Sequence, residues 1–324
     1  MTTNILKSHP FFIKKRTINK FIALIFAVAY AFFIVTSLQL QYSSGSGDVG
    51  SYMHFFNQYE GASAPELTLR ADGAFRLSIF FLRDFLNESV LTVLGYLAFI
   101  MSLIVFYIFS TNIRSQKYLI YFLPLVLMVF FTPNVQVLFS SNIRSGIAFT
   151  ILLIAILYSQ GITRLFLLGL ASIIHLAMLP MIAMYYFYFI LNSKFVNSAH
   201  LLSVFLLILS AAFIAIVGSA VHVEAVNSAS FAYNLLILYL LLILVAVNKR
   251  VLKNVFGFVS VGLLVIYLVG LIIEVSYIRY VGNAVLFYLL FLIKEGEFKS
   301  IQAFTICYIP FFLLTLSYSV TNLL

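Results

Sequence analysis

Charged residues are scarce in this chain: only 9% of its 324 residues are charged, while 63% are hydrophobic. A soluble domain carries about 25% charged residues and about half apolar ones. A water-soluble core cannot hide this much apolar surface, whereas a bilayer can, because lipid solvates the outer face of a membrane protein. The long apolar runs also exclude a transmembrane β-barrel, whose strands alternate apolar and polar residues. We therefore expect an all-α polytopic integral membrane protein.

Cysteine and several familiar ligand-binding motifs are rare or absent. Cys307 is the only cysteine, which excludes an intrachain disulfide and a cysteine-based metal site. The sequence also lacks a P-loop, the HExxH of metalloproteases and the Asp-x-Asp of metal-bound sugar nucleotides. No apolar run carries a regular arginine ladder, so a voltage sensor is not expected. We expect neither a cofactor nor a metal.

The apolar runs predict a single membrane domain, residues 1–324, with about ten or eleven transmembrane helices. The runs are 21–40, 89–109, 118–132, 144–159, 164–179, 180–191, 200–219, 231–247, 255–273, 280–293 and 300–320. Several are shorter than the roughly 20 residues of a perpendicular span, which is tolerated where helices break or line a polar cavity. Pro180 is the expected break between two of them. The first run resembles a signal peptide, but no small-residue cleavage site follows it, so we expect an uncleaved helix.

The basic residues predict the orientation. With residues 1–20 in the cytoplasm, every lysine falls on the inner side, as the positive-inside rule requires. The net charge of +9 is thus explained by topology, and no nucleic-acid partner is expected. Arginine grips phosphate or carboxylate with a planar fork. The outer side carries only arginines as basic residues: Arg70, Arg76, Arg83, Arg144 and Arg279. We therefore expect the polar chemistry at the outer face.

The main extracytoplasmic segment is predicted to be 41–88. Asp48 and Tyr52 stand four residues apart and would share a helix face, with Glu60 following; a solvated loop is the alternative. The second part, 73–86, reads as an amphipathic helix that lies along the membrane surface. The apolar positions of that helix are Phe75, Ile79, Leu82 and Leu86, with Arg76 and Arg83 among them.

Three polar residues lie at the predicted outer ends of spans. Arg144 is costly at that depth unless it meets an anion or a carboxylate, so a phosphate ligand is expected; snorkelling to lipid headgroups is the alternative. His175 lies in an apolar run and is either a hydrogen-bonded core residue or a functional group. Arg279 precedes Tyr280 and is either a second ligand or the ion-pair partner of Glu274.

In their order along the chain, these features resemble the Wzy-type polysaccharide polymerases, particularly the EpsG-like branch. Three segments carry the resemblance: Asp48-x-x-x-Tyr52 with Tyr59-Glu60, then Asn142-x-Arg144-x-Gly146-Ile147-Ala148, then Ala171-Ser172-x-x-His175. Ile278-Arg279-Tyr280 is similar to the late arginine of that family. One departure is Ser145, where glutamine is frequent in the family.

The resemblance implies a bacterial inner-membrane enzyme that joins repeat units of O-antigen, capsule or exopolysaccharide. Its substrate would be an oligosaccharide on undecaprenyl pyrophosphate, and a chain-length regulator and a flippase would be partners. Pyrophosphate leaves, so arginines would stabilise its charge without a metal. The implied glycan and pyrophosphate ligands are Arg144, Arg279, Tyr52, Arg76 and Tyr280. His175, Asp48 or Glu60 would be the base, or His175 would grip phosphate beside Arg144.

Three other functions compete with this one. An O-antigen ligase has similar chemistry but usually a large late outer loop, and the loops at 219–230 and 274–279 are short. A transporter or flippase of lipid-linked sugars predicts charges in mid-span positions and often an internal repeat, and neither is evident. A membrane acyltransferase often carries His-x4-Asp or Asn-His, which no histidine here fits.

Overall fold

The computed structural model describes most of the chain and is helical throughout the described parts. The described residues are 10–44, 47–58, 73–112, 119–192, 231–248, 250–272, 279–295 and 298–321. Within these ranges every regular element is an α-helix or a short 3-10 helix. The predicted all-α class is therefore confirmed, while the predicted span 200–219 and residue Glu60 lie outside the described residues.

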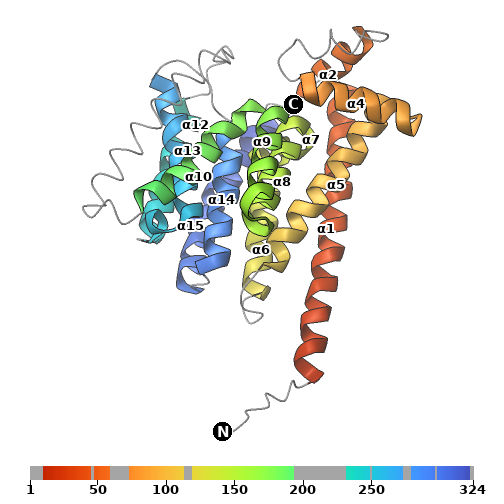
Figure 1. Cartoon of the computed structure of the whole chain (residues 1–324). Helices are drawn as coiled ribbons and strands as arrows, with labels where there is room; N and C mark the ends of the chain where they lie inside the picture. The colour runs from red at the N-terminus through yellow and green to blue at the C-terminus, as the bar shows by residue number, and fades with distance from the viewer. Residues whose placement is uncertain are drawn as a thin grey trace.

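The N-terminal part consists of two long helices that pack side by side and two shorter ones at one end (Figure 1). The long helices are α1 (Pro10–Ser44) and α5 (Val90–Thr111), and the shorter ones are α2 (Gly47–Gln58) and α4 (Gly73–Leu86). In Figure 1, α4 lies crosswise to α1 and α5. Ser89 caps α5, because its hydroxyl accepts a hydrogen bond from the Thr92 amide at 3.1 Å.

The middle of the chain folds into short helices. They are α6 (Leu119–Phe130), α7 (Pro133–Ser140), α8 (Ile143–Tyr158), α9 (Gly161–Ile174), the 3-10 turn η2 (Leu176–Met178) and α10 (Leu179–Leu191). Only Ser159 and Gln160 separate α8 from α9, so these two helices pack as an antiparallel pair. Gly161 begins α9 with φ +55°, a value that glycine adopts without strain.

The C-terminal part surrounds one helix that is buried over most of its length. Its elements are α12 (Phe231–Val247), η3 (Val251–Lys253), α13 (Val255–Ile272), α14 (Arg279–Glu295) and α15 (Phe298–Thr321). Every residue of α14 from Tyr280 to Ile293 is buried. A helix that is apolar all round is buried inside a large or membrane-embedded structure. Thus α14 is the central helix of the bundle.

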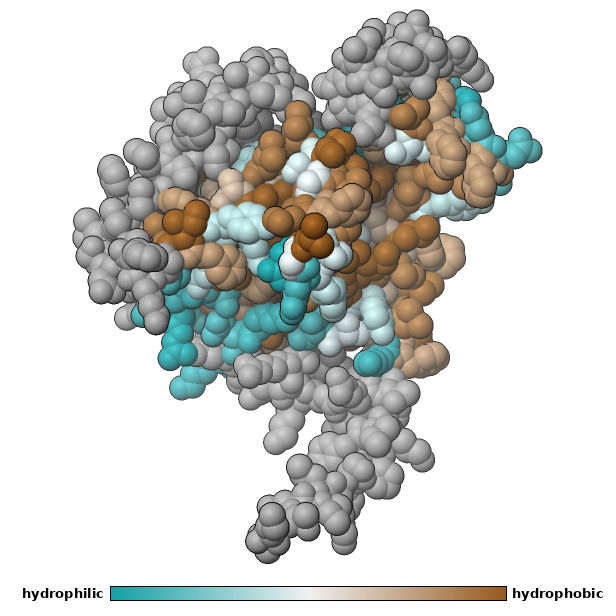
Figure 2. Space-filling model, viewed as in Figure 1, coloured by the Kyte–Doolittle hydropathy of each residue, from teal (hydrophilic) through white to brown (hydrophobic). Residues whose placement is uncertain are grey.

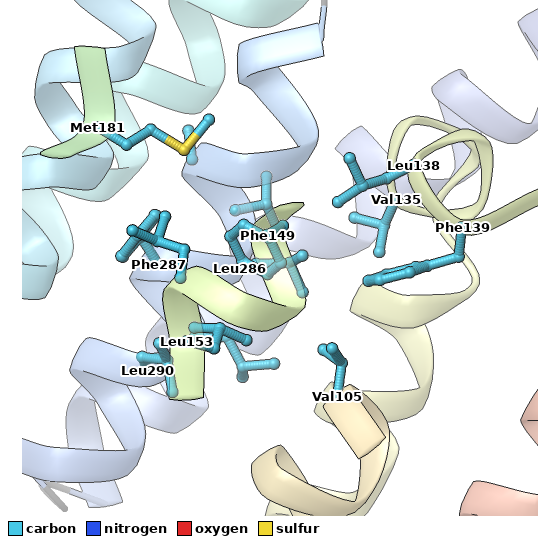
Figure 3. Close-up of a cluster of buried hydrophobic side chains, with 14 of the residues drawn as sticks. Val105, Val135, Leu138, Phe139, Phe149, Leu153, Met181, Leu286, Phe287 and Leu290 are labelled. Carbon is cyan, nitrogen blue, oxygen red and sulfur yellow. The ribbon is translucent and has the colours of Figure 1, made fainter. Parts of the chain in front are cut away.

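Side chains from five helices meet in the core that Figure 3 shows. Phe149 of α8 meets Phe287 of α14 edge to face, with ring centroids 5.8 Å apart. Such aromatic pairs contribute about 0.5–1.5 kcal/mol beyond their burial. Val105 of α5, Phe139 of α7 and Met181 of α10 belong to the same buried cluster. The core therefore joins the N-terminal helices to the central helix α14.

The surface is largely apolar, as a lipid-embedded protein requires. Figure 2 shows hydrophobic residues over much of this face, with hydrophilic ones gathered toward its lower margin and at the outer end of α4. By length and composition, three described helices can cross a membrane: Lys20–Ser43, Val90–Thr111 and Lys299–Leu316. The bent pair α6–α7 makes a fourth if it is one span. A membrane-embedded helical protein is therefore supported, and the count of ten or eleven spans stays a prediction.

The ends of several helices are joined by hydrogen bonds at one side of the bundle. These bonds connect the end of α5 with that of α8, α9 with α10, α10 with η3, the start of α13 with the end of α14, and the end of α12 with the start of α15. The pairs are Asn112–Tyr158, Arg164–Tyr185, Tyr188–Lys253, Asn254–Glu295 and Asn248–Ser300. They tie together the helix ends that the sequence predicts to be cytoplasmic.

Two predicted boundaries differ from the structure. The run 118–132 ends as α6 at Phe130, and a second helix, α7, follows it that hydrophobicity did not predict. The break in 164–191 lies at His175, not at Pro180, which sits in the first turn of α10. Proline is well tolerated in the first turn of a helix because the amide there needs no partner.

Candidate functional site

The elements that carry the predicted site residues meet at the end of the bundle opposite the joined helix ends. α2 follows α1 there, α8 and α14 begin there, and α9 ends there (Figure 1). Gln41 near the end of α1 donates a hydrogen bond to Ser140 at the end of α7, at 3.2 Å. The short helix α7 thus lies at this end, in contact with α1, α8 and α14.

A sharp bend between α6 and α7 creates α7. The two helices meet at 64°. Pro133 disfavours a helical conformation at the residue before it, and Thr132 is extended, with φ −68° and ψ 131°. The break satisfies its own backbone, as a membrane interior demands. The side-chain amide of Gln136 donates to the Phe131 carbonyl at 2.9 Å. The Thr132 carbonyl accepts from the backbone amides of Val135 and Gln136.

Two glycines allow α8 and α14 to approach α7 closely. A Cβ atom at Gly146 of α8 would lie 2.6 Å from the Leu138 carbonyl oxygen of α7. A Cβ atom at Gly282 of α14 would lie 2.5 Å from the Asn134 carbonyl oxygen, at the other end of α7. Small residues let helix backbones pack this tightly in membranes. Hence α7 is held between the first turns of α8 and α14.

Arg144 lies in the first turn of α8 and is half-buried. The N-terminus of a helix carries a partial positive charge and repels cations, so an arginine there does not stabilise the helix. The first turn of α8 holds no acidic residue. Unpaired helix amides and a guanidinium side by side favour a bound anion. The position of Arg144 is therefore suited to an anionic ligand.

Tyr52 of α2 contacts Arg144 across 92 residues of sequence. The Arg144 Nε donates a hydrogen bond to the Tyr52 hydroxyl at 3.2 Å, and its guanidinium carbon lies 5.6 Å from the centre of the tyrosine ring. The Tyr52 ring also packs on Phe75 of α4, with centroids 5.6 Å apart. The structure therefore brings together Tyr52 and Arg144, which the sequence assigned to one site.

Arg76 belongs to the same end of the molecule but is engaged by α2. Its guanidinium stacks over the Phe55 ring at 3.6 Å from the ring centre, a cation–π contact. The predicted helix 73–86 is confirmed as α4, and its Phe75 and Ile79 are buried. Leu86, another apolar position of the predicted helix, is 42% exposed.

Arg279 and Tyr280 open the central helix α14. Arg279 is its first residue, and the side chain of Arg279 lies outside the described residues. Tyr280 is buried, two residues before Gly282 and its contact with α7. α7 has 8 residues and is therefore about 12 Å long. The helix starts that carry Arg144 and Arg279 thus pack along the two ends of one short helix.

His175 ends α9 at the level of Arg144. Ser159 and Gln160 form the turn that joins the antiparallel helices α8 and α9. His175 lies 15 residues after Gln160, and Arg144 lies 15 residues before Ser159. Equal numbers of residues at the same rise place both at the same height. The His175 backbone is extended, with φ −151° and ψ 110°, and its side chain is 1% exposed. The turn η2 that follows contacts α8.

The remaining predicted acids are placed only in part. Asp48 lies in α2, one helical turn before Tyr52, and its side chain is outside the described residues, as is all of Glu60. Residues 45–50 match the spacing GxGxxG, but the element before them is the helix α1, not the strand of a dinucleotide-binding fold. In the described part of the chain, no three His, Cys, Asp or Glu side chains gather to hold a metal ion.

Sequence reasoning missed the helix that joins the site together. α7 contributes no charged residue, so nothing in its composition predicted a role. Two signals were present: Thr132-Pro133, which ends a helix and starts another, and Gly146 two residues after Arg144. Only the close approach of backbones shows that they belong together.

Comparisons with known proteins add no relative to these observations. No family model matches the chain, and neither does any curated protein or solved structure.

Proposed function

We propose that this chain is a membrane glycosyltransferase of the Wzy type, similar to the EpsG-like polymerases, that joins lipid-linked oligosaccharide repeat units. An acceptor hydroxyl oxygen of one unit attacks the anomeric carbon of a glycan carried on undecaprenyl pyrophosphate. The bond between that carbon and the pyrophosphate oxygen breaks, and the carrier pyrophosphate leaves with the electron pair. The hydroxyl proton passes to a base. The products are a longer lipid-linked glycan and a free carrier.

One observation carries this proposal: two arginines lie in the first turns of helices that both pack against α7. Arg144 is the second residue of α8 and Arg279 is the first of α14, and neither first turn holds an acidic residue. Helix N-termini and guanidinium groups both stabilise anions. A pyrophosphate leaving group develops negative charge as its bond breaks, so such an arrangement would lower the barrier. Tyr52 would hold the Arg144 fork through its hydroxyl.

The proposed orientation has the N-terminus in the cytoplasm and this site at the outer face of a bacterial inner membrane, with ten or eleven spans. The opposite end of the bundle carries Lys253, Lys294 and Lys299, and the site end carries arginines without lysine among its described residues. This distribution agrees with the positive-inside rule. A carrier lipid in the outer leaflet would then reach Arg144 from the side, past α4.

Three residues are candidates for the base: His175, Asp48 and Glu60. Histidine is suited to proton transfer near neutral pH. His175 lies at the height of Arg144, and its side chain is 1% exposed. Asp48 lies one turn from Tyr52 on α2.

Deleting the gene and analysing the surface glycan on a gel distinguishes the proposal from its rivals. Loss of a polymerase leaves single repeat units attached. Loss of a ligase leaves no glycan on the acceptor lipid, and loss of a flippase leaves none exported. A glycan profile of either of these last two kinds would refute the polymerase.

Substituting Arg144 tests the proposed clamp in the same strain. Arg144→Ala is expected to abolish long chains, because losing one such donor lowers the rate by about 100- to 1,000-fold. Arg144→Lys is expected to restore only short chains, since lysine lacks the fork. Arg250→Ala removes the same charge from the opposite end and should leave chain length unchanged. Normal chains from Arg144→Ala would exclude the clamp, provided that immunoblots show the protein in the membrane.

A further inference from the structure

A second feature lies beside the Arg144 site: a pocket of about 380 Å³ between α2, the end of α4 and the start of α5. This volume falls within the roughly 300–1,000 Å³ of small-molecule sites. Met53, Phe56 and Val90 form its apolar part. Its polar side chains are Asn57, Arg83, Asp84, Asn87, Glu88 and Ser89. None of these residues belongs to the site proposed above.

The end of α4 builds the polar side of this pocket. Asn87 has φ +53°, and the Glu88 amide donates to the Arg83 carbonyl at 3.2 Å, which is the capping pattern of a helix that ends in a left-handed residue. The turn presents the side chains of Asn87, Glu88 and Ser89 in succession. Arg83 is held by Asp84 at 2.7 Å and by the Phe80 ring. The polar wall is therefore set by the local fold.

The chemistry of the lining favours a polyhydroxylated ligand over an anion. The side-chain amides of Asn57 and Asn87 both donate and accept hydrogen bonds, as sugar hydroxyls do. Asp84 and Glu88 accept from hydroxyl groups, and Phe56 and Met53 offer an apolar surface to the C–H face of a sugar ring. Two carboxylates against one guanidinium give the lining a formal charge of about −1, which repels phosphate.

One helix connects this pocket to Arg144. Tyr52 of α2 accepts a hydrogen bond from Arg144. The pocket is lined by residues that follow on the same helix: Met53, Phe56 and Asn57. From Tyr52 to Asn57 the helix rises about 7.5 Å. Arg144 and the pocket therefore contact the same short helix, about one and a half turns apart along it.

We propose that this pocket is a saccharide subsite that binds a neutral or amino sugar of the lipid-linked glycan. The identity of the glycan rests on the proposed function, whereas the saccharide chemistry rests on the pocket itself. The subsite would set which sugar is accepted, while the arginine holds the carrier phosphate. It would thus be a specificity determinant separate from the site of bond breaking.

Binding of simple sugars to the purified full chain in nanodiscs tests the subsite. The probes are methyl glycosides of glucose, galactose, mannose and N-acetylglucosamine, observed by saturation-transfer NMR. At least one is expected to bind the wild-type protein. The double variant Asn57→Ala/Asn87→Gly should bind it about tenfold more weakly, because two hydrogen-bonding amides are lost. Glycine keeps the left-handed turn at position 87, so the fold of α4 is preserved.

Controls separate this proposal from the polymerase proposal. Asn192→Ala removes an amide outside the pocket and should leave binding unchanged, and Arg144→Ala should do the same. Inorganic pyrophosphate should not displace the sugar. Absence of binding by every glycoside, an unaffected double variant, or displacement by pyrophosphate would each overturn the subsite. Sugar binding together with normal polymer from Arg144→Ala would keep the subsite and refute the polymerase clamp.

Discussion

The hydroxyl of Tyr52 is the contact that connects α2 with Arg144, at 3.2 Å from its Nε. Hydrogen bonds to charged groups are stronger than neutral ones, and this one orients the guanidinium fork. The ring of Tyr52 makes a different contact, since it packs on Phe75. The hydroxyl and the ring can therefore be tested apart.

We predict that Tyr52→Phe shortens the glycan while the protein keeps its stability. The ring packing stays, and only the orienting hydrogen bond is lost, at a cost of about 1–2 kcal/mol in the transition state. The transfer rate should fall about 5- to 30-fold, measured as polymer formed from lipid-linked units in membranes. Tyr239→Phe deletes a hydroxyl that donates to the Cys307 carbonyl and serves as the control. Equal rates for Tyr52→Phe and Tyr239→Phe would contradict the orienting role.

At the scale of elements, the short helix α7 organises the site because it determines where two other helices begin. It packs against Gly146 of α8 and Gly282 of α14 at backbone contact distance. Its own sequence bears no charge, and its role follows from shape alone. A change in the spacing between α7 and its neighbours would move Arg144 and the start of α14 relative to each other.

Gly146→Ala is predicted to destabilise the fold and to impair polymerisation. The new methyl group would meet the Leu138 carbonyl oxygen and the Met101 sulfur, at 2.6 and 2.7 Å from the Cβ position. Overpacking of this kind costs about 1–3 kcal/mol. The measurement is the midpoint of thermal unfolding in detergent, together with glycan length.

Gly169→Ala is the matched control for this helix contact. Gly169 lies inside α9, and an added Cβ there would meet no described atom within 4 Å beyond the neighbouring backbone of its own helix. Alanine is favoured over glycine in a helix by about 1 kcal/mol, so the variant should unfold no earlier than the wild type. If both alanine variants unfolded at the wild-type temperature, the tight contact between α7 and α8 would be wrong.

For the whole molecule, the two ends of the bundle differ in their polar residues. One end holds the site and the sugar pocket, and the other holds five hydrogen bonds between helix ends. Between them the surface is apolar, and at the site end α4 turns Phe81 and Phe85 outward, 66% and 74% exposed. Such residues suit contact with lipid at the membrane surface.

Cysteine labelling is predicted to place these two ends on opposite sides of the membrane. Cys307 is the only cysteine, so Cys307→Ala gives a background without thiols. A membrane-impermeant maleimide should label His54→Cys and Asn57→Cys in intact cells. Lys294→Cys and Lys299→Cys should react only after the membrane is opened. Labelling of all four in intact cells, or the reverse pattern, would reject the proposed orientation.

The sequence by itself determined the class of the protein and most helix positions, because burial in lipid needs long apolar runs that are visible in composition. It also singled out Arg144, since an arginine near the membrane is costly without a partner, and Tyr52, through its spacing from Asp48. The tertiary structure decided that these two residues touch, that α7 exists, and that α9 ends at His175. The contact of Tyr52 with Arg144 joins residues 92 apart in the chain, and the position of α7 depends on backbones that glycine lets approach. Hydrophobicity along the sequence carries no information about such contacts.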